Sequence, residues 1–162
     1  MNIVVDTQIA SEDDDAPDPA TVTHWVSQVI QHLAISGDIE VSVRIVDQEE
    51  GQRLNSQYRQ KDYATNVLSF PIEKNDDIPF RHLGDIVACH PVIKRESAEQ
   101  NKTLGQHWAH MIIHGSLHLL GYDHINDDEA EIMEAIEIKI LSELGYGNPY
   151  TSQEQLASNL PY

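Results

Sequence analysis

The feature that most constrains the fold of this 162-residue chain is a histidine pair, His114 and His118, one helical turn apart. On a helix expected from about 103 to 120, residues at i and i+4 project from one face, so both imidazoles can reach one metal ion. Gly121 then allows the chain to leave the helix through a left-handed residue, and the turn can return His124 to the same ion. The spacing therefore predicts a three-histidine metal site at the C-terminal end of a central helix.

A site built from three imidazoles leaves one ligand position open. Catalytic zinc sites have three protein ligands at about 2.0–2.1 Å and keep a fourth position for water, whereas structural zinc sites usually have four protein ligands. Imidazole also suits copper, iron and nickel, so the sequence predicts one transition metal ion, with Zn²⁺ as the first candidate. His110 lies four residues before His114 and is a candidate neighbour of a ligand, but not a predicted ligand. The other histidines are interpreted as ordinary surface or core residues: His24, His32, His82, His90 and His107.

The same spacing matches the long motif of zinc metallopeptidases, His-Glu-x-x-His-x-x-Gly-x-x-His, at every position except the second. Gly115 stands where those enzymes need a glutamate as general base. A different substrate or a different base is therefore implied. Asp85 and Asp123 are candidates for a base or for the acceptor of a ligand histidine, and equally for ordinary turn residues. A metallopeptidase-like or other metal-dependent hydrolase with the same triad remains an alternative.

Strand-like and helix-like patterns interleave along the chain. In IEVSVRIVD, which starts at Ile39, apolar residues alternate with mostly polar ones, and this is typical of a half-buried strand. Interleaved elements in a chain of this length predict a single α/β or α+β layer fold. Further strands are expected at 2–6, near 67–70 and at 85–88, and helices at 19–34, 47–59, 92–100, 103–120 and from 126 to about 144. Residues 11–18 are interpreted as a polar, acidic connector.

Local signals also predict where helices and the domain end. Asp47 followed by Glu50 resembles a capping box and predicts the start of a helix. Gly145 is expected to close the last helix. Residues 1–146 are predicted to form one domain and residues 147–162 a polar, mobile tail. The buried stripe of the last helix is expected to consist of Ile132, Ile136, Ile140 and Leu144.

The stretch HGSLHLLGYDH, residues 114–124, closely resembles the signature of the YbeY family of bacterial endoribonucleases, the rRNA maturation factors. The resemblance continues upstream in the family's order through LNSQYR (54–59), TNVLSFP (65–71) and LGDI (83–86), and covers about residues 40 to 145. The family's usual Thr-Asp-Val reads Thr-Asn-Val here. Asn66 therefore retains hydrogen bonding but removes a charge.

This resemblance implies a metal-dependent endoribonuclease acting on single-stranded RNA, in 16S rRNA 3′-end maturation and ribosome quality control. It implies an α+β fold with a mixed sheet of about four strands flanked by helices, and the ribosome or ribosomal proteins as partners. The family's metal triad carries over to His114, His118 and His124. Its functionally important arginine carries over to Arg59, which without the resemblance would be interpreted as a solvated helix-end residue. A further alternative is a non-catalytic ribosome-associated protein whose zinc is structural, and that requires a fourth ligand.

The formal charge of −17, from 10 basic and 27 acidic residues, limits the kinds of partner. It excludes a protein that coats nucleic acid or anionic membrane by bulk electrostatics, and no DNA ligand is expected. Nine of the ten basic residues lie between Arg44 and Lys102, in a near-neutral segment that contains Arg59 and can line one basic groove. A ribosome or protein partner is therefore expected to help deliver an RNA substrate.

The sequence gives no indication of secretion or membrane insertion. The single cysteine, Cys89, cannot form an internal disulfide and is interpreted as a small buried hydrophobic residue. The N-terminal segment lacks the basic and apolar regions of a signal peptide, and no stretch approaches the ~20 apolar residues of a membrane span. The expected compartment is therefore the cytoplasm.

Overall fold

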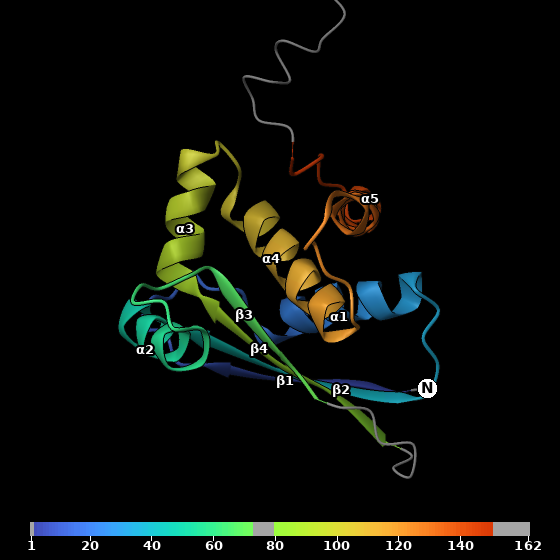
Figure 1. Ribbon diagram of the computed structural model, residues 1–162, viewed down its shortest axis with the longest axis horizontal. Coiled ribbons are helices and arrows are strands. Elements are labelled where there is room, and N and C mark those ends of the chain that lie inside the picture. Colours follow the sequence, from blue (N-terminus) through green and yellow to red (C-terminus); the bar gives the residue numbers. More distant parts are fainter. Residues whose placement is uncertain (1, 73–79, 151–162) are drawn as a thin grey trace, which may run out of the picture.

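A four-stranded sheet forms the centre of the computed structural model, which describes residues 2–72 and 80–150 (Figure 1). β1 (Ile3–Ile9) and β4 (Phe80–Cys89) both run parallel to β2 (Asp38–Val46), and β3 (Val67–Pro71) is antiparallel to β4. The strand order is β1-β2-β4-β3. The predicted α+β class, with a mixed sheet of about four strands flanked by helices, is confirmed.

Five helices accompany this sheet in the described part of the chain. In Figure 1, α4 lies above the sheet between α3 and α5, and it also packs against α1, so it is the central helix that the sequence predicts. α2 covers part of the opposite face, where Leu54 joins a small apolar cluster around Val87 and Cys89. The helices are α1 (Pro19–His32), α2 (Gln48–Arg59), α3 (His90–Glu99), α4 (Leu104–Leu119) and α5 (Asp127–Glu143).

The alternating pattern of β2 produces the main core. Its four alternating apolar residues are at most 1% exposed, because they all point to the sheet face that α1 and α4 cover. The intervening side chains point to the other face. The buried residues are Ile39, Val41, Val43 and Ile45.

Two strands are longer than predicted. β1 continues to Ile9, and β4 begins at Phe80 rather than at 85. The first half of β4 carries polar residues such as Arg81 and His82, so a prediction based on alternating apolar residues does not detect this part of the strand. Arg81 pairs with Ile39 of β2, and the ladder continues along both strands after a one-residue shift of register between Glu40 and Val41. Backbone groups make these hydrogen bonds, so a central partner strand can extend β4 through polar residues.

The predicted capping box before α2 is wrong in its side-chain contacts. Asp47 is the N-cap residue but makes no capping hydrogen bond with its side chain. Its carboxylate instead accepts hydrogen bonds from Ser11 Oγ at 2.5 Å and from the backbone N–H of Glu12 at 3.0 Å. Glu50 forms an ion pair with Arg44, with 2.5 Å between Oε2 and Nε. Both acids are therefore used by contacts outside their own helix.

The predicted buried stripe of α5 is wrong at Ile132, which is 56% exposed, whereas Met133 is buried. Each step of four residues on a helix with 3.6 residues per turn drifts by about 40°, so the three steps from residue 132 to residue 144 turn by about 120° and leave the buried face. Gly145 follows the helix with a φ of +91°, which confirms the predicted helix end. The buried residues of α5 are Met133, Glu137, Ile140 and Leu141.

The first four residues of the predicted tail, 147–150, belong to the described part of the chain. Pro149 is buried, and its carbonyl oxygen accepts a hydrogen bond from Lys102 Nζ at 2.5 Å. The rest of the predicted tail, residues 151–162, lies outside the described residues. The start of this segment therefore packs against the domain.

Candidate metal centre

α4 carries His114 and His118, and the chain turns back immediately after this helix ends at Leu119. Gly121 has a φ of +97°, so the predicted left-handed exit from the helix is confirmed. This conformation is costly for residues with a Cβ atom and is readily adopted by glycine. The turn places His124 beside the two helical histidines.

The three imidazoles of the predicted triad converge on one point. Nε2 of His118 lies 3.0 Å from Nε2 of His114. The ring centroid of His124 lies 5.4 Å from that of His114 and 5.1 Å from that of His118. One ring nitrogen of each histidine lies within 4.8 Å of the other two. The structure therefore brings together all three residues that the sequence predicts as metal ligands.

A fourth residue, Glu137 of α5, contacts the triad and is missed by the sequence analysis. Its carboxylate is fully buried and accepts a hydrogen bond from His114 Nδ1 at 2.8 Å. His110 Nε2 lies 3.2 Å from the same oxygen, so His110 is a neighbour of a ligand, as suggested by its position. A local signal exists, because Glu137 lies on the same helix face as Met133 and Leu141. An acid within an apolar stripe indicates a buried partner.

The electrostatics of the site favour an ionised Glu137 and a neutral His118. Burial by itself raises the pKa of the Glu137 carboxyl, but hydrogen bonds from His110 and His114 outweigh it and lower the pKa to about 2. Burial, followed by the charges of His114 and His124, lowers the pKa of His118. A neutral imidazole keeps the lone pair that a metal ligand must donate.

The chemistry of this donor set fits a transition metal ion. Two imidazole nitrogens 3.0 Å apart, as in His114 and His118, require a proton or a cation between them. Ligands at 2.0–2.1 Å around a tetrahedral ion lie roughly 3.3 Å apart, which is close to this separation. Within residues 2–72 and 80–150, no cysteine or carboxylate joins this group of three histidines as a fourth ligand. The site can thus hold one ion and retain an open position.

A cavity of about 640 Å³ opens beside the triad. Arg59, the last residue of α2, also lines this cavity. Arg59 donates one hydrogen bond to the carbonyl oxygen of Ser69 at 2.9 Å, and its guanidinium carbon lies 5.0 Å from the centre of the Phe70 ring. Ser69 Oγ in turn donates to the carbonyl oxygen of Gly115 at 3.1 Å. Strand β3 therefore links Arg59 to α4 and positions it at the histidine cavity.

Gly115, which replaces the general base of metallopeptidases, faces the sheet. A Cβ atom at this position would lie 3.2 Å from Cγ2 of the fully buried Ile86 and 3.2 Å from Ser69 Oγ. A larger side chain would have to enter the interface between α4 and the sheet. The structure therefore has no room at position 115 for the glutamate of the metallopeptidase motif.

The two aspartates considered as bases lie in different places. Asp123 lines the histidine cavity, and its Oδ1 accepts a hydrogen bond from the backbone N–H of His124 at 2.8 Å. Asp85 is not among the residues that line this cavity and instead lies 3.7 Å from Nε2 of His82. Asp123 thus stays a candidate for orienting His124, whereas Asp85 contacts no residue of the triad in the described structure.

Asn66, the position that departs from the resembled motif, is hydrogen-bonded to a partly buried acid. Its Nδ2 group donates to both carboxylate oxygens of Glu96, at 3.2 and 3.4 Å, and its Oδ1 accepts from the Val67 N–H at 2.7 Å. Glu96 also lies 2.9 Å from His107 Nε2. Burial raises the pKa of Glu96, but His107 and Asn66 outweigh it, so the net shift is downward. An aspartate at position 66 could not donate to Glu96 when ionised.

Asn66→Asp is expected to lower the free energy of unfolding at pH 7 by about 1–3 kcal/mol, because it removes a donor and adds a like charge beside a partly buried carboxylate. In the wild type, the lowered pKa of Glu96 stabilises the folded state at pH values above 4.5, the ordinary pKa of a glutamate. This stabilisation is lost as the pH falls below 4.5. In the variant the charge of Asp at position 66 opposes the ionisation of Glu96. The difference in free energy of unfolding between variant and wild type should therefore become smaller as the pH is lowered toward 4.5. Urea denaturation at both pH values measures this.

The double variant Asn66→Asp with Glu96→Gln is the control for that experiment. In this variant the amide at position 96 can donate a hydrogen bond to the carboxylate at position 66, which reverses the roles of the wild-type pair. The free energy of unfolding should therefore recover toward the wild-type value. An equal loss of stability at both pH values, with no recovery in the double variant, would show that repulsion from Glu96 is not the cause.

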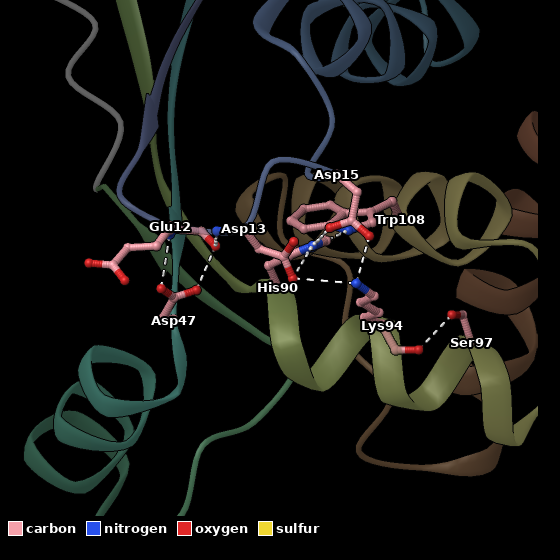
Figure 2. Close-up of polar contacts among 9 residues, drawn as sticks. Glu12, Asp13, Asp15, Asp47, His90, Lys94, Ser97 and Trp108 are labelled. Carbon is pink, nitrogen blue, oxygen red and sulfur yellow. Dashed lines mark hydrogen bonds and ion pairs between the residues drawn. The ribbon is translucent and has the colours of Figure 1, made fainter.

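A second group of acids around a histidine lies where the acidic connector 11–18 meets α3 (Figure 2). His90 Nε2 lies 2.6 Å from Asp15 Oδ1, and Trp108 Nε1 donates to His90 Nδ1 at 3.1 Å. Since the indole only donates, His90 carries its proton on Nε2 and has no lone pair there for a metal. Lys94 Nζ, 2.7 Å from Asp15 Oδ2, already supplies a cation. This group fastens the connector to the domain.

None of the helices in the described part of the chain combines the length and apolar composition needed to cross a membrane.

Comparisons with known proteins bear on the same residues. The model of the family described as "Endoribonuclease YbeY" matches residues 7–145. A protein named "Endoribonuclease YbeY" from Stutzerimonas stutzeri (strain A1501) is 55% identical over 151 residues, which cover 91% of each chain. A protein of the same name from Pseudomonas putida (strain W619) is 55% identical over 141 residues, covering 85% of this chain and 87% of that protein.

A solved structure is also similar. The solution structure of TM1509 from Thermotoga maritima has a TM-score of 0.56 and 26% sequence identity, and the match covers 86% of this chain and 91% of that one. The segment matched by the family model includes Arg59, Asn66 and all three histidines of the triad.

Proposed function

Because the chain belongs to the YbeY family of endoribonucleases, we propose that it is a metal-dependent endoribonuclease that cleaves single-stranded RNA. The observation that carries the proposal is the convergence of His114, His118 and His124 at a cavity that Arg59 also lines. A cation site next to a guanidinium is suited to a phosphodiester, whose negative charge increases in the transition state.

The three imidazoles would hold one transition metal ion, and we propose Zn²⁺ first. When bound, such an ion supplies Lewis-acid stabilisation of phosphate charge and lowers the pKa of water. The open position of the triad in the described structure supports a catalytic site rather than a structural one, which usually has four protein ligands.

Arg59 is proposed to bind the scissile phosphate. Its hydrogen bonds to the carbonyl oxygens of Tyr58 and Ser69 use two of the five N–H donors of the guanidinium, and the others can bind phosphate oxygens. The contact with the Phe70 ring restrains the side chain further. A donor held in place before the reaction stabilises developing charge without reorganising.

The cellular role that we propose is 16S rRNA 3′-end maturation and ribosome quality control in the cytoplasm. Membership of the family and the motif at residues 114–124 support this role. The net charge of −17 supports delivery of the RNA by the ribosome or a ribosomal protein, because the chain as a whole repels free nucleic acid. Neither DNA nor a membrane is a proposed partner.

The test is an assay of chelated and zinc-reconstituted protein on labelled single-stranded and duplex RNA. Cleavage of the single strand by the reconstituted protein only is the expected result. A protein that binds one ion but leaves single-stranded rRNA fragments intact would contradict the proposal, and cleavage of a peptide instead would favour the hydrolase alternative. Analysis of the new ends identifies the nucleophile, since a 2′,3′-cyclic phosphate indicates the RNA 2′-hydroxyl and a 5′-phosphate indicates water.

Arg59→Ala is expected to lower the rate of RNA cleavage by about 10²–10³-fold, as for other pre-positioned donors that stabilise an anionic transition state. Arg59→Lys should recover little of this loss, because an ammonium group cannot bind a phosphate in the bidentate manner of a guanidinium. Metal affinity should stay unchanged in both variants. Single-turnover cleavage and metal titration measure the two effects.

Arg53→Ala is the matched control, since Arg53 is an exposed arginine of the same helix that does not line the histidine cavity. A similar loss of rate in both arginine variants would indicate a general effect of positive charge on RNA binding rather than a role of Arg59 at the scissile phosphate.

A further inference from the structure

Glu137 is a buried acid, and the donors that surround it in the described part of the chain lie at the candidate metal centre or next to it. Its side chain has no exposed surface, although burial of an unpaired carboxylate is costly. Three groups compensate for this burial. His114 Nδ1 and His110 Nε2 lie 2.8 and 3.2 Å from Oε2, and the Tyr150 hydroxyl donates to Oε1. These contacts hold the carboxylate in one orientation.

The contact with Glu137 determines which nitrogen of His114 carries the proton. A carboxylate oxygen accepts this hydrogen bond, so His114 donates it from Nδ1. The neutral ring then has its lone pair on Nε2, and that nitrogen faces His118 Nε2 at 3.0 Å. The imidazole is therefore held in the tautomer and the orientation that a metal ligand at this point needs.

Tyr150 reaches this site from the short segment that follows α5. Its ring packs edge-on against His110, with 5.3 Å between ring centroids, and its hydroxyl reaches Glu137. The hydrogen bond between Lys102 and the carbonyl oxygen of Pro149 holds the segment in place. Tyr150 lies beyond residue 145, where the match to the family model ends. The contact thus involves a residue outside the segment that the family model matches.

We propose that Glu137 is a positioning residue that holds His114 ready for metal binding, and that Tyr150 completes the set of donors that fixes Glu137. This inference rests on the proposed metal centre. It assigns the segment after α5 a role in metal affinity, although no residue of that segment belongs to the triad.

The experiment measures Zn²⁺ affinity by competition with a chelator in the full-length chain. Glu137→Gln is expected to weaken binding by about 10–100-fold, the usual effect of removing the partner of a metal-bound histidine. Tyr150→Phe should weaken binding in the same direction, by up to about 10-fold, because one hydrogen bond to a charged group is lost. The controls are Glu131→Gln, an exposed acid of the same helix, and Tyr146→Phe, a partly buried tyrosine whose hydroxyl lies near Gly105. Both controls should bind Zn²⁺ like the wild type.

A second measurement uses the metal-free protein and ¹⁵N-detected NMR of the imidazole groups. His114 should carry its proton on Nδ1 in the wild type, and Glu137→Gln should weaken that preference. This measurement separates positioning from a merely structural role. If Glu137→Gln fails to fold, Tyr150→Phe provides the test, because Tyr150 is 40% exposed and the substitution removes only its hydroxyl.

The outcomes distinguish this inference from the proposed function. Wild-type protein that binds no transition metal would overturn the metal centre, while the NMR measurement would still test the contact with His114. Wild-type affinity in both Glu137→Gln and Tyr150→Phe would overturn the positioning role and leave the proposed function standing. A loss of affinity in Tyr150→Phe equal to that in Tyr146→Phe would overturn the role of Tyr150.

Discussion

His124→Ala is expected to lower the rate of RNA cleavage by at least about 10³-fold and to weaken metal binding strongly. A metal ion contributes several kcal/mol of transition-state stabilisation in phosphate chemistry, and about 4 kcal/mol corresponds to a factor of 10³ in rate. His124 is the exposed member of the triad, so its removal creates no buried cavity. The free energy of unfolding of the metal-free protein should therefore stay close to the wild-type value. Single-turnover cleavage, metal content and urea denaturation measure the three quantities.

His24→Ala is the matched control, because His24 is an exposed histidine on α1. It should retain metal binding and activity. Full metal content and wild-type activity in His124→Ala would show that the third ligand, and with it the proposed centre, is wrong. A loss of activity with unchanged metal affinity would instead place His124 at the RNA rather than at the ion.

Gly115→Glu, which completes the metallopeptidase motif, is expected to lower the free energy of unfolding by about 3–5 kcal/mol and to confer no peptidase activity. The Cβ atom would already lie 3.2 Å from Ile86 Cγ2 and from Ser69 Oγ, so the carboxylate would be forced into the interface between α4 and the sheet. Burying an unpaired charge in this interface is costly in free energy and destabilises the folded state. Urea denaturation and a peptide-cleavage assay of the zinc-loaded variant test both parts of the expectation.

The control for this substitution is Gly105→Glu, in the first turn of the same helix. Gly105 is exposed, and a glutamate near a helix N-terminus interacts favourably with the helix dipole. Its stability should be close to that of the wild type or above it. A Gly115→Glu variant with wild-type stability and measurable peptidase activity would show that residue 115 faces the metal centre, and would favour the hydrolase alternative.

The amino-acid sequence by itself determined the local parts of the site. His114 and His118 lie on one face because the repeat of the helix is fixed, and Gly121 permits the left-handed exit that returns His124. Local patterns also predicted a layered fold of strands and helices, and the structure has the alternating burial expected for β2. The mixed sheet itself was implied only by the family resemblance. The same holds for Arg59, because only its resemblance to the family motif distinguished it from a solvated residue at a helix end.

The tertiary structure decided everything that depends on segments distant along the chain. It placed the end of α2 at the histidine cavity, turned Gly115 toward Ile86, and extended β4 along β2 through polar residues. It also placed Glu137 and Tyr150 around His114. The physical reason is that periodicity reports which face of an element is buried, but not which groups it meets there. A carboxylate such as Glu137 is stable in the interior only because donors from α4 and from the segment after α5 surround it.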